Sequence, residues 1–156
     1  MFLALVSMIS VQPTAASLDG AVVSTHNPAE LIELLQQEGY KAKLGKDNVG
    51  DPMIESATSG SDFAIYFYGC KGNLNCEDVQ FMTSYKADPK KPFQLDTMNQ
   101  YNAKYRFGKA SIEADKDARI EMDVVFTDGR MNRKAFVEHL NIWTSAVANF
   151  RQTIGW

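Results

Sequence analysis

Alternating apolar and polar residues in the middle of the chain predict antiparallel strands. If Cys70 lies opposite Cys76, then Phe67 lies opposite Val79 in a hairpin. The apolar residues that this register turns toward one side are Ile54, Phe63, Ile65, Phe67, Val79 and Phe81. The opposite side carries Cys70, Tyr66, Tyr68, Asp78, Gln80 and Met82. A slip of one residue would expose the apolar set to water, so the cysteine spacing and the apolar pattern support each other.

Turn residues predict two further hairpins. Gly60-Ser61 suits a type II′ turn, which requires glycine at its first loop position. The pairs implied by this turn are Thr58 with Phe63, Ser56 with Ile65, and Ile54 with Phe67. The later hairpin turns at Asp115-Lys116-Asp117. Its implied pairs are Ile112 with Ile120, Ala110 with Met122, and Gly108 with Val124, with Glu121 and Asp123 facing the other way.

The first helix is predicted over about residues 28 to 38 by its start and stop signals. Asn27 suits the N-cap, Pro28 the first helical position, and Gly39 the left-handed residue after the end. Its apolar face consists of Leu31, Leu34 and Leu35. A short strand is expected directly afterwards, at residues 40–44.

Two more helices are predicted in the second half of the chain. Asp96 or Thr97 would cap a helix from Met98 to about Lys104. Asn132 would cap the last helix, whose apolar residues are spaced 4, 3, 4, 3, 4 as on one helix face. These residues are Phe136, Leu140, Trp143, Val147, Phe150 and Ile154. The elements together predict an α+β fold, an antiparallel sheet of hairpins with helices packed on it.

Residues 1–16 have the character of a signal peptide. The first 18 residues carry no charged side chain, and the apolar run from Phe2 to Val11 is shorter than the roughly 20 residues of a membrane-spanning helix. Small residues at Thr14-Ala15-Ala16 suit cleavage after Ala16. No basic side chain precedes the run, so an N-terminal strand and an uncleaved anchor remain alternatives. Cleavage would leave residues 17–156 as a single domain, periplasmic or secreted, without stable membrane insertion.

Charge and composition disfavour several classes of function. The net charge is −3 at pH 7, the pI is near 5.4, and charges of both signs are interspersed, so neither nucleic acid nor anionic lipid is an expected partner. His26 and His139 lie in no motif with a nucleophile or another metal ligand, and no phosphate-binding glycine loop precedes a helix. We therefore predict no catalytic residue, no cofactor and no metal site.

In an oxidising compartment, Cys70 and Cys76 are expected to form a disulfide. Closing this small loop would restrain the unfolded chain and stabilise the fold by about 2 to 3 kcal/mol. The alternative is a redox-active pair, but the cysteines lack the C-x-x-C spacing and the helix N-terminus that lower a thiol pKa.

The order and spacing of several segments resemble the YbjN-domain family, in its exported, cysteine-containing subgroup. These segments are the helix from Asn27-Pro28 to Gly39-Tyr40, residues 51–56, residues 63–70, residues 99–110 and Glu121-Met122-Asp123. The resemblance covers nearly the whole mature chain. It implies a fold similar to type III secretion chaperones and carries the label of a bacterial sensory transduction regulator.

On these grounds we predict a non-enzymatic, exported binding or chaperone-like protein with protein partners, and the analogy to secretion chaperones suggests a homodimer. One alternative is an envelope signalling adaptor with a single defined partner. Another is a thiol-disulfide oxidoreductase that uses Cys70 and Cys76. Tyr66 and Tyr68 are the leading recognition candidates, because amphipathic aromatic side chains suit protein contacts. Further polar candidates, either a structural network between helix and sheet edge or a recognition rim, are Asn99, Asn102, Arg106 and Asp123.

Overall fold

The computed structural model describes residues 20–156. The predicted signal peptide over residues 1–16 lies outside the described residues. The helices and strands are β1 (Val22–Ser24), α1 (Pro28–Gln37), β2 (Ala42–Lys46), β3 (Pro52–Thr58), β4 (Ser61–Tyr68), β5 (Asp78–Tyr85), α2 (Leu95–Lys104), β6 (Lys109–Ile112), β7 (Ala118–Val125), β8 (Arg130–Asn132) and α3 (Arg133–Ile154).

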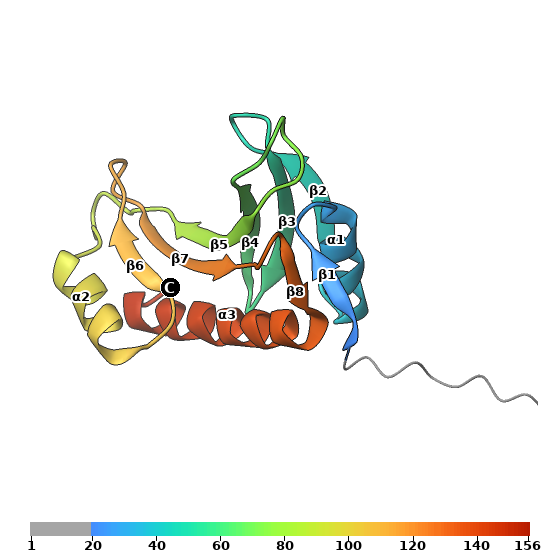
Figure 1. Cartoon of the computed structure of the whole chain (residues 1–156). Coiled ribbons are helices and arrows are strands. Elements are labelled where there is room, and N and C mark those ends of the chain that lie inside the picture. Colours follow the sequence, from blue (N-terminus) through green and yellow to red (C-terminus); the bar gives the residue numbers. More distant parts are fainter. Residues whose placement is uncertain (1–19) are drawn as a thin grey trace, which may run out of the picture.

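A six-stranded antiparallel sheet with the order β2-β3-β4-β5-β7-β6 forms the centre of the molecule. The helix α3 runs along one face of this sheet, while α1 packs beside β1 and β2 and α2 lies beside β6 (Figure 1). The strands β1 and β8 form a separate two-stranded sheet near the start of α3. The predicted α+β architecture is confirmed.

The apolar side of α3 fills the core, as its spacing predicts. Five of the six predicted residues are fully buried, and Ile154 is partly buried against them. The Trp143 ring packs between two aromatic rings of the sheet, with centroids 5.9 Å from Phe63 and 5.7 Å from Phe81. The inward register of β4 and β5 is also confirmed, since Phe67 pairs with Val79.

The turn between β3 and β4 differs from the prediction by one residue. The loop is Ser59-Gly60, and both residues have positive φ, 50° and 72°, as a type I′ turn requires. The observed pairs are Thr58 with Ser61, Ser56 with Phe63, and Ile54 with Ile65. The Arg151 guanidinium donates to the Ser59 carbonyl. A side chain at Gly60 would come within 2.8 Å of the same guanidinium. The partner of each β3 residue therefore lies two positions earlier in β4 than predicted. A shift of two positions keeps the same side chains facing the core.

The register predicted between β6 and β7 is also wrong by two residues. The loop lies between Glu113 and Asp117, which share a backbone hydrogen bond of 2.9 Å, and Lys116 takes the left-handed conformation. The observed pairs include Ile112 with Ala118 and Ala110 with Ile120, while Gly108 lies before the strand. The Asp117 carboxylate accepts from the backbone N–H of Ala87 at 2.9 Å and pairs with Lys86, which fixes this turn from another part of the chain.

Helix starts were predicted correctly for α1 and α3 but not for α2. Asn27 and Asn132 cap their helices through side-chain oxygens that accept backbone hydrogen bonds. The helix α2 begins at Leu95, so Asp96 and Thr97 lie in its first turn and neither is the cap. The Asp96 carboxylate instead accepts a hydrogen bond from Gln100, one turn later.

Candidate protein-interaction surface

The sheet face opposite α3, here called the uncovered face, is built from alternate residues of β3, β4, β5 and β7. Its residues are Met53, Glu55, Ala57, Asp62, Ala64, Tyr66, Tyr68, Asp78, Gln80, Met82, Ser84, Arg119, Glu121, Asp123 and Val125. No described helix packs on it, whereas the intervening residues form the core under α3. The uncovered face is therefore the part of the sheet that a partner can reach.

The middle row of the uncovered face runs across four neighbouring strands. Met53 pairs with Tyr66, Tyr66 with Gln80, and Gln80 with Asp123. The Gln80 amide donates to the Asp123 carboxylate at 2.7 Å, and the Tyr68 hydroxyl approaches the Gln80 oxygen at 3.4 Å. Tyr68 is 48 % exposed and Tyr66 is half-buried. The structure thus brings three of the predicted recognition residues, Tyr66, Tyr68 and Asp123, into one polar and aromatic row.

The surroundings of Tyr68 are acidic. Partial burial, followed by the negative charges of Glu121 and Asp123 and of Asp47 in the β2–β3 loop, raises the pKa of Tyr68 above its ordinary value of 10.0. At neutral pH the side chain is consequently a neutral hydroxyl with an aromatic ring. Both parts are available for contact.

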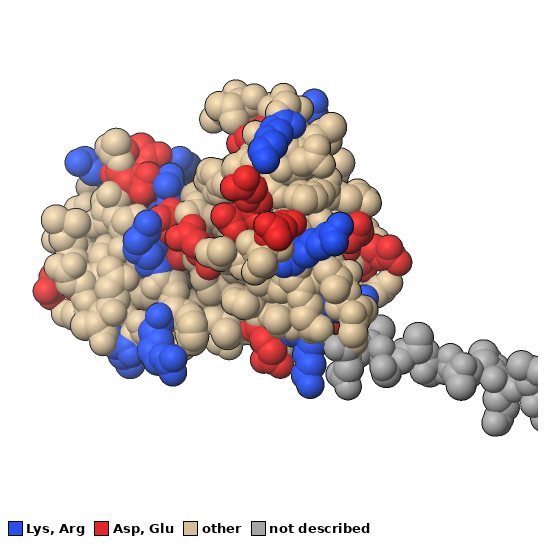
Figure 2. All heavy atoms as spheres, in the orientation of Figure 1, with Lys and Arg blue, Asp and Glu red and all other residues tan. Residues whose placement is uncertain are grey.

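The carboxylates of the uncovered face differ in their partners. Glu121 is buried and pairs with Lys109, and one Arg119 nitrogen lies 3.7 Å from it. Asp123 and Asp78 form no ion pair within residues 20–156, although Asp78 accepts a backbone hydrogen bond from Phe126 at 2.8 Å. Acidic side chains gather in the middle of the view in Figure 2, around β5 and β7. Asp78 and Asp123 therefore add negative charge to this part of the surface that no ion pair among the described residues neutralises.

Beside Tyr66 the uncovered face is hollowed into an open depression of about 530 Å³. Ala64 and Met82, which are paired across β4 and β5, line it. Glu55, which pairs with Lys43 at 3.6 Å, and Asp62 line it as well. The depression can receive an apolar side chain, and its rim favours a positively charged neighbour.

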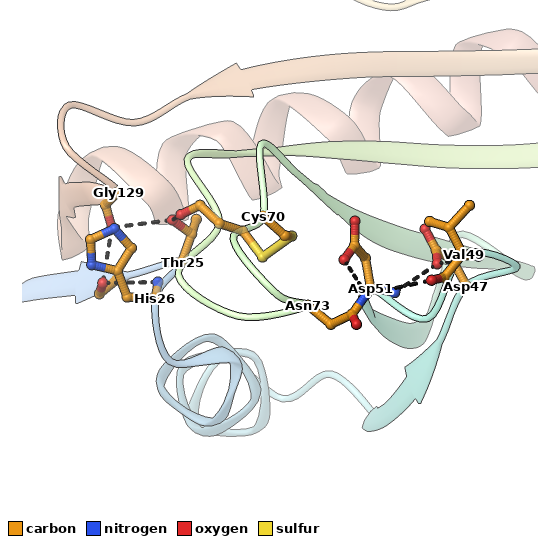
Figure 3. The surroundings of a disulfide bond; sticks show 10 residues. Thr25, His26, Asp47, Val49, Asp51, Cys70, Asn73 and Gly129 are labelled. Carbon is orange, nitrogen blue, oxygen red and sulfur yellow. Dashed lines mark hydrogen bonds between the residues drawn. A yellow bond between two sulfur atoms is a disulfide. The ribbon is translucent and has the colours of Figure 1, made fainter.

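The disulfide lies at the end of β4 and β5, next to Tyr68. Cys70 and Cys76 are bonded as predicted, and Cys76 is fully buried. The Asn73 amide donates to the Asp51 carboxylate at 2.8 Å, which joins the disulfide loop to the β2–β3 loop (Figure 3). These two loops rise together at the top of Figure 1.

A second set of contacts anchors the disulfide loop to Thr25 and His26, between β1 and α1. The Thr25 hydroxyl donates to the Cys76 carbonyl, and the Thr25 backbone N–H donates to the Gly129 carbonyl at 2.9 Å. The His26 side chain lies against Gly129, where a side chain would come within 2.3 Å of the imidazole (Figure 3). The disulfide loop is thus held from both sides.

The other predicted recognition residues lie away from the uncovered face. Asn102 accepts from the backbone N–H of Ala110 at 2.8 Å and donates to its carbonyl at 3.0 Å, which ties α2 to the edge strand β6. Asn99 is exposed on α2. Arg106 lies over the Phe107 ring at 5.3 Å, beside α3. Asn102 therefore links the helix to the sheet edge, and Asn99 and Arg106 do not join Asp123.

Met53 and Asp47 contribute to the surroundings of Tyr66 and Tyr68, and neither was identified from the sequence. Met53 lies beside Tyr66, and Asp47 acts on Tyr68 from the β2–β3 loop. Alternation along β3 could have placed Met53 on this side, because Ile54 faces the core. The approach of Asp47 depends on how the loop folds, and no sequence pattern indicates it.

The histidines show no arrangement typical of a catalytic or metal site. The His139 ring contacts the Ala135 carbonyl of its own helix at 2.7 Å, and His26 packs on Gly129. In the described part of the chain, no group of three or more His, Cys, Asp or Glu side chains could hold a metal ion. Within the same residues, no helix combines the length and apolar character needed to cross a membrane.

Comparison with known proteins gives one match. Residues 27–156 match the model of the YbjN family, described as "Putative bacterial sensory transduction regulator". No curated protein and no solved structure shows significant similarity to the chain.

Proposed function

Since the chain belongs to the YbjN family, we propose that it is a non-enzymatic, exported binding protein whose uncovered face holds a basic segment of a partner protein. The family description names regulation rather than a catalysed reaction. The observation that carries the proposal is the exposed Tyr68 ring close to Asp123, a carboxylate that forms no ion pair among the described residues.

A lysine or arginine side chain fits this surface in two ways. Its cation can lie over the Tyr66 or Tyr68 ring, a contact that contributes about 0.5 to 1 kcal/mol at exposed sites. The same cation can pair with Asp123, which adds specificity and a faster association rate. Met53 and Met82 provide adaptable apolar contacts for the neighbouring residues of the segment.

Export is supported by the disulfide and by the apolar leader. Disulfides persist in oxidising compartments and are rare in the bacterial cytoplasm. The buried sulfur of Cys76 and the anchoring of its carbonyl by Thr25 favour a structural bond over the alternative of a redox-active pair. Mass spectrometry of the protein recovered from the periplasm should give a mass that corresponds to residues 17–156 with one disulfide.

The proposal is tested with a double variant, Tyr66→Ala/Tyr68→Ala. Tyr66 is half-buried and Tyr68 is exposed, and neither lies in the core, so the variant should remain folded. Binding of a model peptide that alternates lysine and valine should fall about tenfold or more relative to wild type. A peptide that alternates glutamate and valine should bind neither protein. Phe107→Ala, which removes an exposed ring from the α2–β6 connection, is the matched control and should leave binding unchanged.

Two further measurements, the salt dependence of binding and the number of captured partners, test the electrostatic contacts and distinguish an adaptor from a chaperone-like protein. Binding should weaken as ionic strength rises, because the contacts are exposed charges. Capture from an envelope extract distinguishes an adaptor, which returns one stoichiometric partner, from a chaperone-like protein, which returns many. A native mass spectrum tests the proposed homodimer. Equal binding of the lysine and glutamate peptides, or binding unaffected by the double variant, would refute the proposal.

A further inference from the structure

A second site lies on the helix side of the sheet, in a pocket between the α2–β6 connection and α3. Its volume is about 260 Å³, slightly below the usual range for drug-sized ligands, so it suits a small molecule. The connection crosses α3 in Figure 1. Its lining includes Tyr105, Arg106 and Phe107 from the connection and Asn141, Ser145 and Asn149 from α3.

The walls of this pocket are fixed by hydrogen bonds. The Tyr101 hydroxyl lies 3.3 Å from the Phe107 carbonyl and 3.2 Å from the Ala146 carbonyl of α3, so it can bridge the connection and the helix. Just beyond Phe107, Gly108 has a φ of +82°, and a side chain there would come within 2.8 Å of Ile120. Asn102 holds the start of β6 at Ala110. The pocket is therefore preformed, and a ligand need not order it.

The polar groups at the pocket are a cation and two neutral amides. The Arg106 guanidinium is held over the Phe107 ring at 5.3 Å and forms no ion pair within residues 20–156. Asn141 and Asn149 line the same pocket from α3, and neither side-chain amide has a hydrogen-bond partner among the described residues. Tyr105, Phe107, Ile142 and Ala146 supply apolar surface.

We propose that this pocket binds a small monocarboxylate with an apolar body, its carboxylate on Arg106 and its body between Phe107 and α3. Arginine forms paired, charge-assisted hydrogen bonds with a carboxylate. One cation with two neutral amides matches a single negative charge better than a doubly charged phosphate. This site does not depend on the partner proposed for the uncovered face.

The test uses the mature protein labelled with ¹⁵N, with phenylacetate as the probe and phenylacetamide as its neutral counterpart. Phenylacetate should shift the amide resonances of residues 105–108 and 141–149 with a Kd of about 1 mM, as expected for a ligand of this size. Phenylacetamide should bind about fivefold to tenfold more weakly, because it lacks the charge that Arg106 recognises.

Two variants and one control locate the site. Arg106→Gln should remove the preference for the acid over the amide, and Arg130→Gln, which removes the same charge from β8, should retain it. Ser145→Phe should fill the pocket from its exposed edge and abolish binding of both compounds. Absence of shifts up to about 20 mM phenylacetate, equal binding of acid and amide, or an unchanged preference in Arg106→Gln would overturn the proposal.

Discussion

The two faces of the six-stranded sheet come from alternate residues of the same strands, yet they have opposite properties. On the covered face, Phe63 and Phe81 meet Trp143 of α3 in a closed aromatic core. On the uncovered face, Tyr66 and Tyr68 lie beside carboxylates and open space. One strand residue therefore packs in the core, and its neighbour lies on the uncovered face, where we propose that a partner binds.

This difference means that the uncovered face is available for the proposed binding, because the core on the other side of the sheet stabilises the fold. Core packing on one side fixes the strands, so the sheet register places the side chains on the other side. Substitutions on the two faces should consequently separate, with large losses of stability from one and loss of binding from the other.

Trp143→Ala should produce the largest effect. The ring is fully buried, and its indole N–H has no hydrogen-bond acceptor among the described residues, so its contribution is packing. Removing it should lower the free energy of unfolding by about 3 to 5 kcal/mol, measured by urea denaturation. Tyr68→Ala on the uncovered face is the control and should cost less than about 0.5 kcal/mol. Similar losses in both variants would mean that the two faces do not differ as described.

Loss of the disulfide should have an intermediate effect. The double variant Cys70→Ser/Cys76→Ser should lose about 2 kcal/mol of unfolding free energy, because the small loop no longer restrains the unfolded chain. Amide exchange should accelerate over residues 71–77, while the middle of β4 and β5 stays protected. It should also accelerate at Thr25, whose hydroxyl donates to the Cys76 carbonyl and whose backbone N–H donates to the Gly129 carbonyl. A reductant should destabilise the wild type equally and leave the variant unchanged. A wild type insensitive to complete reduction would contradict this role.

The inward and outward sides of β4 and β5 were predictable because two independent local signals agree. The spacing of Cys70 and Cys76 sets the register, and alternation assigns the faces. The helix α3 was equally predictable from its apolar spacing. Errors of two residues in the other hairpins did not change any face, since the side-chain period of a strand is two.

The turn conformations were not predictable from the local sequence, because contacts with distant residues stabilise them. Ser59 takes a positive φ, uncommon for serine, where Arg151 from the end of α3 donates to its carbonyl. The turn before Asp117 is held by Lys86 and Ala87, about thirty residues earlier. The separation of Arg106 from Asp123 was also not predictable, because it depends on the tertiary fold. The α2–β6 connection lies against α3 rather than on the uncovered face.

Asp123→Asn should have the smallest effect and tests the electrostatics of the uncovered face directly. Burial and nearby carboxylates raise the pKa of Tyr68, so folding favours the neutral phenol. The resulting stabilisation is fully present below the ordinary pKa of 10.0 and is lost as pH rises through the folded-state value.

In the Asp123→Asn variant, the pKa of Tyr68 should move toward 10.0 but stay above it, because burial is the largest cause and remains. An NMR titration of the Tyr68 ring measures the shift, and Asp96→Asn on the remote helix α2 is the charge-matched control. Identical titrations of Tyr68 in the two variants would show that Asp123 does not act on this ring. The basic partner proposed for the uncovered face would then lose its electrostatic basis, although the aromatic row itself would remain.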